Sequence, residues 1–186
     1  QARHDAPTLN PVVSTQVKRS GVESSHAPIR VLMVCLGNIC RSPTAHGVFQ
    51  DRIDRADMQD RIQVDSAGTG NYHIGERPDS RSMEAASMRG YDLDSLRARQ
   101  VSASDFEAFD YILAMDRANL AALNASCPPA LESKLALFLS YAPSSQDSVP
   151  DPYYSGTDGF EEVLDLVEVA ADNLMSHILL RHFSSD

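Results

Sequence analysis

The stretch C-L-G-N-I-C-R-S-P, residues 35–43, decides how the rest of this chain is read. A short apolar run, residues 31–34, precedes it, and apolar residues at helical spacing follow it. This order predicts a strand, a tight loop and then a helix whose N-terminus opens onto the loop. Such a loop turns several backbone N–H groups into one small space, and the helix dipole adds positive potential there. The natural occupant of that space is an anion.

Several side chains give this anion site a chemistry. Arg41 carries a guanidinium whose planar fork matches two oxygens of a phosphate-like group. Cys35 stands at the entrance of the loop, where the same N–H donors and the same arginine favour a thiolate. Ser42 can donate its hydroxyl to that thiolate, Asn38 can brace the loop through its side chain, and Gly37 leaves room for backbone to approach a ligand. The stretch therefore predicts a nucleophilic cysteine facing a bound oxyanion.

This pattern resembles the phosphate-binding loop of the low-molecular-weight protein tyrosine phosphatases. Further along the chain, D-P-Y-Y at residues 151–154 resembles the general-acid loop of that family, and S-A-G at 66–68 and M-D at 115–116 add to the likeness. The resemblance spans residues 30–183. It implies an α/β domain at residues 29–184, a three-layer sandwich around a central parallel sheet of about four strands, with a Rossmann-like phosphatase fold.

The resemblance also implies a mechanism. Cys35 would attack phosphorus to give a phosphocysteine, Arg41 would hold the phosphoryl oxygens, and Asp151 would protonate the leaving tyrosyl oxygen and later activate water. Since an aspartate is mostly ionised at neutral pH, an acidic activity optimum is expected. Phosphate binding and loop support fall to Leu36, Gly37, Asn38, Ile39, Cys40 and Ser42, and the walls of the substrate pocket to Tyr72, Tyr153 and Tyr154.

The implied substrates are phosphotyrosine proteins and small aryl phosphates, hydrolysed without a metal ion or another cofactor. Bacterial relatives often act on a tyrosine kinase, which makes such a kinase a candidate partner. The formal charge of -10 argues against nucleic acid as a partner. No apolar run is long enough for a membrane span or the core of a signal peptide, which predicts a cytoplasmic protein with no membrane partner.

The cysteines leave one question open. None of the three lies in a C-x2-C pair, which argues against a disulfide framework and against a zinc site. Cys40 follows Cys35 by five positions, so it could form a reversible disulfide that protects the nucleophile, or it could simply pack under the loop. Cys127 is expected to be inert.

The remaining sequence alternates between strand and helix patterns. Residues 1–28 lack periodicity and are rich in Ser, Thr, Pro and Val, so they predict a disordered extension, with a transit peptide as the alternative. Residues 135–139 are apolar throughout and fit either a strand or a short helix, and the family favours a strand. Strands are also predicted at 31–34, 62–68 and 111–114, helices at 43–56, 80–88, 104–107, 116–123 and 160–178, and loops at 69–79 and 143–159.

Three polar residues near these elements receive lesser roles. His46 on the first helix is expected to be a surface or packing residue, and His73 lies close enough to the expected mouth of the site to tune it. Asp116 stands where it can cap the helix that follows.

Three alternatives remain beside the tyrosine phosphatase. An arsenate reductase on the same scaffold would need a downstream cysteine pair, but only Cys127 is available. A protein arginine phosphatase carries threonine where Ile39 stands, and an apolar residue there favours an aromatic phosphate ester. A non-catalytic phosphotyrosine-binding module is disfavoured because Cys35, Arg41 and Asp151 are all present.

Overall fold

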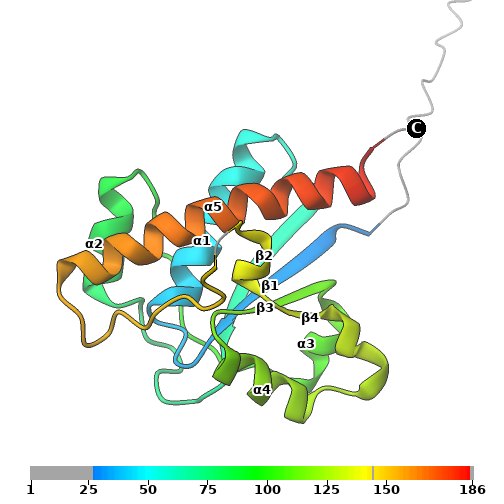
Figure 1. Ribbon diagram of the computed structural model, residues 1–186, viewed down its shortest axis with the longest axis horizontal. Coiled ribbons are helices and arrows are strands. Elements are labelled where there is room, and N and C mark those ends of the chain that lie inside the picture. Colours follow the sequence, from blue (N-terminus) through cyan, green and yellow to red (C-terminus); the bar gives the residue numbers. More distant parts are fainter. Residues whose placement is uncertain (1–26, 144, 185–186) are drawn as a thin grey trace, which may run out of the picture.

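Four parallel strands form one sheet in the order β2-β1-β3-β4 (Figure 1). The computed structural model describes residues 27–143 and 145–184. The extension predicted at residues 1–28 lies, up to residue 26, outside the described residues. The sheet confirms the predicted α/β class, and its strands are β1 (Ile29–Cys35), β2 (Ile62–Gly68), β3 (Tyr111–Ala114) and β4 (Leu135–Leu137).

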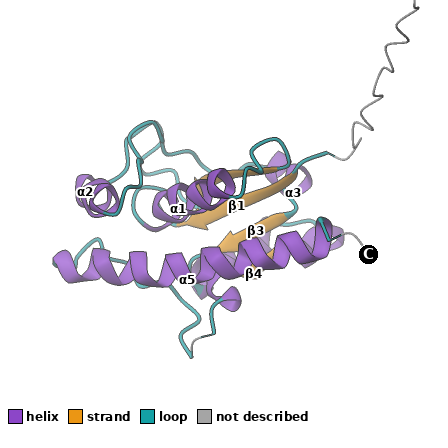
Figure 2. Cartoon of the chain, turned by 90° about the horizontal axis from the view of Figure 1, so that it is seen from above, coloured by secondary structure: helices purple, strands orange, loops and turns teal. Residues whose placement is uncertain are grey.

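Helices cover the sheet on both faces. One hydrophobic cluster joins alternate residues of β1, Val31 and Met33, to the first, second and last helices, and the other joins Leu32 and Val34 to the two helices between them. In Figure 2 the long last helix runs beside the first. None of the helices among the described residues is long and apolar enough to cross a membrane. The helices are α1 (Arg41–Arg55), α2 (Ser80–Met88), α3 (Ala103–Ala108), α4 (Arg117–Ser126) and α5 (Thr157–His182).

β1 is the central element of this arrangement. It pairs with β2 on one side and with β3 on the other, and its residues from Val31 to Cys35 are all buried. A strand covered on both faces needs apolar side chains in both directions, which explains the uninterrupted run at 31–34. The chain reverses its direction of winding at β1, and such a switch point leaves a crevice at the carboxyl ends of the strands. The loop that follows Cys35 opens there.

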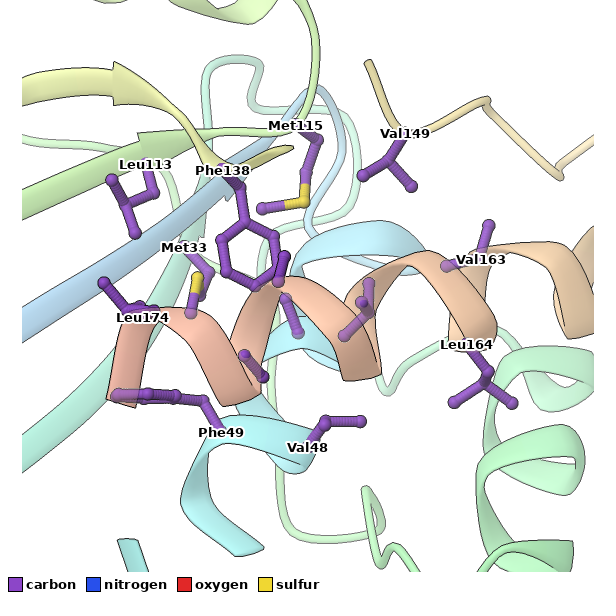
Figure 3. Close-up of a cluster of buried hydrophobic side chains, with 14 of the residues drawn as sticks. Met33, Val48, Phe49, Leu113, Met115, Phe138, Val149, Val163, Leu164 and Leu174 are labelled. Carbon is purple, nitrogen blue, oxygen red and sulfur yellow. The ribbon is translucent and has the colours of Figure 1, made fainter. Parts of the chain in front are cut away.

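The core between the sheet and the α1–α5 side is continuous. Figure 3 shows Met33, Phe49, Phe138 and Leu174 gathered there from β1, α1, the segment after β4, and α5. The three- and four-residue spacing predicted for the last helix is confirmed, because the apolar residues at that spacing are all buried: Phe160, Val163, Leu164, Val167, Ala171, Leu174, Met175 and Ile178.

Several sequence predictions are wrong at their boundaries; the helix predicted at 116–123, for example, spans Arg117–Ser126. The strand expected at 135–139 ends at Leu137, and a 3₁₀ helix, η2 (Phe138–Tyr141), follows because Phe138 turns fully into the core. The Ser140 hydroxyl donates to the Leu137 carbonyl at 2.6 Å, which helps the chain leave the sheet. The helix expected from residue 160 already begins at Thr157, so the preceding loop is shorter than predicted.

Short turns of 3₁₀ helix were also absent from the predictions. A second one, η1 (Pro129–Lys134), connects α4 to β4 after Pro128. The prolines that end α4 restrict the backbone to angles that a 3₁₀ turn accepts.

Truncating Phe49, which is fully buried, tests the core. Phe49→Ala is expected to lower the free energy of unfolding by about 3–5 kcal/mol, because it removes a buried ring and leaves a cavity. Leu180→Ala is the control, since Leu180 is 72% exposed and its loss should cost no more than about 0.5 kcal/mol. Urea unfolding measures both changes, and equal effects of the two substitutions would contradict this description of the core.

Candidate active site

The carbonyl groups of the loop between β1 and α1 point away from its centre and accept hydrogen bonds from neighbouring segments. The carbonyl oxygens of Cys35 and Leu36 accept the N–H groups of residues 69 and 70, both at 2.9 Å, and that of Ile39 accepts the N–H of Asp79 at 2.8 Å. Because a trans peptide points its C=O and its N–H in opposite directions, the N–H that follows each of these carbonyls is turned inward. The loop therefore presents backbone donors to its own interior, as the sequence predicts for an anion site.

Cys35 lies at the base of this interior and is 3% exposed. Its Sγ is 3.0 Å from the Oγ of Ser42 and accepts the N–H of Asn38 at 3.2 Å. The Asn38 Nδ2 donates to the same Ser42 Oγ at 2.7 Å, which leaves the hydroxyl hydrogen of Ser42 for the sulfur. The Asn38 N–H and the Ser42 hydroxyl thus both face Cys35 Sγ.

Asn38 braces the loop in a way that its type makes possible. Its φ of 57° is in the left-handed region, which asparagine tolerates better than most residues. Its Oδ1 accepts the backbone N–H of Arg99 at 3.0 Å. The Arg99 guanidinium in turn bonds the carboxylates of Asp65 and Asp105. The predicted bracing by Asn38 is present, and its backbone partner lies 61 residues away.

Arg41 is 4% exposed and is fixed by the elements on the far side of β1. Its Nη1 donates to Asp116 Oδ2 at 2.6 Å and to the carbonyl of Val149 at 3.0 Å. Asp116 also caps α4, as predicted, by accepting the N–H of Asn119 at 2.7 Å. The sequence predicts that Asp116 caps a helix or anchors a loop, but it does not name Arg41 as the partner. The adjacency of β1 and β3 is what brings the arginine within its reach, and the M-D pair directly after an expected strand was the one available signal.

Asp151 faces the same space from the loop before α5. Its Oδ2 lies 3.9 Å from Arg41 Nη2, and its Oδ1 accepts the N–H of Tyr153 at 3.0 Å. Its side chain is half exposed, so water can reach the carboxyl. One carboxylate oxygen is thus held by the loop while the other points to the arginine.

These groups border one pocket of about 340 Å³. Tyr153 and Tyr154 meet edge to face with ring centroids 4.9 Å apart, and Tyr72 stands on another loop at the rim. Asn38 and Ser42 are buried behind Cys35 and support the loop rather than line the pocket. The lining residues are Cys35, Leu36, Gly37, Ile39, Cys40, Arg41, Tyr72, His73, Asp151, Tyr153 and Tyr154.

The two histidines named above, His46 and His73, lie in different environments. His73 lines the pocket and bonds Glu76, and a Cβ on Gly37 would lie 3.0 Å from its ring, so the space at Gly37 admits the imidazole of His73. His46 is a packing residue whose Nδ1 lies 2.9 Å from Ser66 Oγ. Burial lowers the pKa of His46, which keeps its ring neutral at physiological pH.

Cys40 is buried in the wall of the pocket. Burial raises the pKa of its thiol to about 12, although a bond with Ser82 opposes the shift. All three cysteines, Cys35, Cys40 and Cys127, are free thiols. The disulfide between Cys35 and Cys40 stays a prediction.

A match to a family profile shows which protein family the chain belongs to. Residues 30–182 match the family described as low molecular weight phosphotyrosine protein phosphatase. The chain belongs to this family. A curated relative of that name from Schizosaccharomyces pombe is 45% identical over 151 residues, which cover 80% of this chain and 96% of the relative.

Solved structures agree with the family assignment. The crystal structure of YfkJ from Bacillus subtilis has a TM-score of 0.81 and 39% identity, covering 85% of this chain and 99% of that one. A protein tyrosine phosphatase from Entamoeba histolytica, crystallised with Hepes in its active site, has a TM-score of 0.78 and 41% identity, covering 81% and 96%. The predicted family and the predicted fold are both confirmed.

The raised pKa of Cys40 predicts selective alkylation. At pH 8 a thiol with a pKa of about 12 is about one part in ten thousand thiolate, and the fraction rises tenfold with each pH unit. Iodoacetamide should therefore modify Cys35 well before Cys40 in the native protein, and peptide mapping by mass spectrometry measures the order. Labelling of Cys40 as early as Cys35 would contradict the account.

The bond between Arg41 and Asp116 is expected to matter for stability. Asp116→Asn removes the closer of the two carboxylates that pair with the buried Arg41 but keeps an oxygen for the helix cap, so it should lower the free energy of unfolding by about 2 kcal/mol. Asp147→Asn is the matched control, because Asp147 pairs with the largely exposed Arg117. This substitution should change the free energy of unfolding by less than about 1 kcal/mol. Urea unfolding compares the two, and an Asp116→Asn effect no larger than the control would count against the role of this pair.

Proposed function

We propose that this chain is a protein tyrosine phosphatase that hydrolyses phosphotyrosine through a phosphocysteine intermediate. One observation carries the proposal: Cys35, Arg41 and Asp151 border a single pocket, with Cys35 Sγ beneath the inward-facing donors of the loop. The shared name of the curated relatives supports the same activity.

In the first step a phosphoryl group occupies the loop. Its equatorial oxygens meet the backbone N–H groups and the Nη2 side of Arg41, which offset the charge that develops in the transition state. Cys35 Sγ forms the bond to phosphorus as the bond from phosphorus to the tyrosyl oxygen breaks. Asp151, in its protonated form, gives its proton to that oxygen, so tyrosine leaves as the neutral phenol.

In the second step Asp151 is a carboxylate and takes a proton from water. The oxygen of that water bonds phosphorus, the bond from phosphorus to Cys35 Sγ breaks, and inorganic phosphate leaves with the thiolate restored. The Ser42 hydroxyl and the Asn38 N–H face the sulfur and stabilise it as it departs. The same two contacts thus serve both steps.

The walls of the pocket select an aromatic ester. Tyr72, Tyr153 and Tyr154 stand above the loop at its rim, with Ile39 among the lining residues. A phenyl ring can contact these apolar faces while its phosphate reaches the loop, whereas a serine phosphate is too short to hold the same contacts. We therefore expect protein-bound phosphotyrosine to be preferred.

A tyrosine kinase in the cytoplasm is the partner that we propose. A catalytic thiol must remain reduced, and the chain keeps all three of its cysteines as free thiols, which suits a reducing compartment. Autophosphorylated segments of a kinase would present phosphotyrosine on an accessible chain.

Release of phosphate from matched peptides tests the function. Peptides carrying phosphotyrosine, phosphoserine or phosphoarginine are incubated with the native chain from mildly acidic to mildly basic pH. Phosphotyrosine should be turned over without added metal, best on the acidic side, because the first step needs a proton from the general acid. Cys35→Ser should abolish activity, and Asp151→Asn should slow it by about a hundredfold or more.

The opposite results are equally clear. Binding of the phosphotyrosine peptide by the native chain without release of phosphate would make the loop a recognition site. Preferred turnover of phosphoarginine would reassign the enzyme to the arginine phosphatases.

A further inference from the structure

Arg81, near the start of α2, joins Asp79, two residues before it, to Tyr153 and Phe160, which are distant in sequence. Its Nε and Nη2 donate to the two carboxylate oxygens of Asp79 at 3.1 and 3.0 Å. The same Nη2 donates to the backbone carbonyl of Tyr153 at 3.0 Å. Its guanidinium lies 5.5 Å from the ring centroid of Tyr153 and 4.9 Å from that of Phe160, at the beginning of α5. The mechanism above gives this residue no role.

One end of this connection is fixed to the phosphate-binding loop. Asp79 donates its N–H to the carbonyl of Ile39 at 2.8 Å, and its side chain caps α2 by accepting the N–H of Arg81 at 2.9 Å. The Asp79 side chain is only 12% exposed. The residue that Arg81 binds at this end, Asp79, is therefore fixed to both α2 and the phosphate-binding loop.

The other end is the loop that carries Asp151. On its N-terminal side, Val149 is held by the Arg41 guanidinium at 3.0 Å and donates its N–H to Met115 at 2.8 Å. On its C-terminal side, Arg81 holds the carbonyl of Tyr153, whose N–H is bonded to the Asp151 carboxylate. A displacement of Tyr153 thus moves the carboxyl of Asp151 directly.

We propose that Arg81 is a positioning residue that holds the Asp151 loop over the phosphate-binding loop at the distance that proton transfer requires. The inference rests on the proposed function, because it concerns how Asp151 is placed. The Arg81 side chain is 45% exposed, and an ion pair so open to water adds little to stability. Its planar fork, however, binds a carboxylate and a carbonyl at once, which fixes geometry.

A comparison of substrates with different leaving groups distinguishes misplacement of the acid from a general loss of structure. The value of kcat/KM reports events up to departure of the leaving group. Phenolate is a strong base and needs the proton from Asp151, whereas p-nitrophenolate is a weaker base and leaves with little help. A misplaced acid therefore slows phenyl phosphate selectively.

Arg81→Ala is assayed with both substrates. Since a general acid contributes about a hundredfold or more, partial misplacement should lower kcat/KM by about tenfold for phenyl phosphate and by less than about twofold for p-nitrophenyl phosphate. Arg81→Lys keeps the charge but cannot bridge both partners, so it should give a smaller loss with the same selectivity. Arg77→Ala is the control, because Arg77 pairs with Asp94 outside the Asp151 loop and should leave both values unchanged.

The same substitution is then made in an Asp151→Asn background. If Arg81 acts through Asp151, Arg81→Ala should cause no further loss with phenyl phosphate there, and the two effects should be strongly non-additive. Equal losses for both substrates, or full additivity with Asp151→Asn, would overturn the inference. If instead the native chain turned over neither substrate, the proposed function itself would have failed, which is a separate result.

Discussion

The outward anchoring of the loop carbonyls after β1 is the constraint on which the rest of the site depends. Bonds from Thr69, Gly70 and Asp79 hold these carbonyls away from the centre, and the planarity of the peptide then turns the following N–H groups inward. The burial of β1 on both faces provides the rigid end from which the loop departs. Backbone donors of one loop face both the space for an oxyanion and the Cys35 sulfur, which is how one loop can serve binding and covalent chemistry.

Around that loop the fold places charged side chains by adjacency of distant segments. Parallel pairing of β1 with β3 brings Asp116 to Arg41, and the carbonyl of Val149 completes the attachment. Arg81 makes a similar connection, between α2 and the loop that carries Asp151. Each arginine connects a rigid element to a loop. The acid, the nucleophile and the anion site can therefore keep a common geometry, although they come from separate parts of the chain.

The local part of this arrangement was readable from the sequence. The strand, loop and helix around residues 35–43, and the support of Cys35 by Ser42 and Asn38, follow from spacing within one short stretch. The links of Asp116 to Arg41, of Arg99 to Asn38 and of Arg81 to Tyr153 did not, because each joins segments whose contact depends on the finished sheet. The end of β4 also depends on the finished fold. The apolar pattern continues through Phe138, but Phe138 reaches the core from a 3₁₀ turn rather than from the strand.

The central claim is that Cys35 itself carries the phosphoryl group during turnover. The most direct measurement is to mix the chain with a phosphotyrosine peptide, quench the reaction in its first turnovers, and examine the peptide that contains Cys35 by mass spectrometry. Asp151→Asn should prolong the intermediate, since activation of water is slowed. We predict the mass of one added phosphoryl group on Cys35, absent from Cys35→Ser. Rapid release of phosphate with Cys35 unmodified throughout would contradict the account, because water would then attack the bound ester directly.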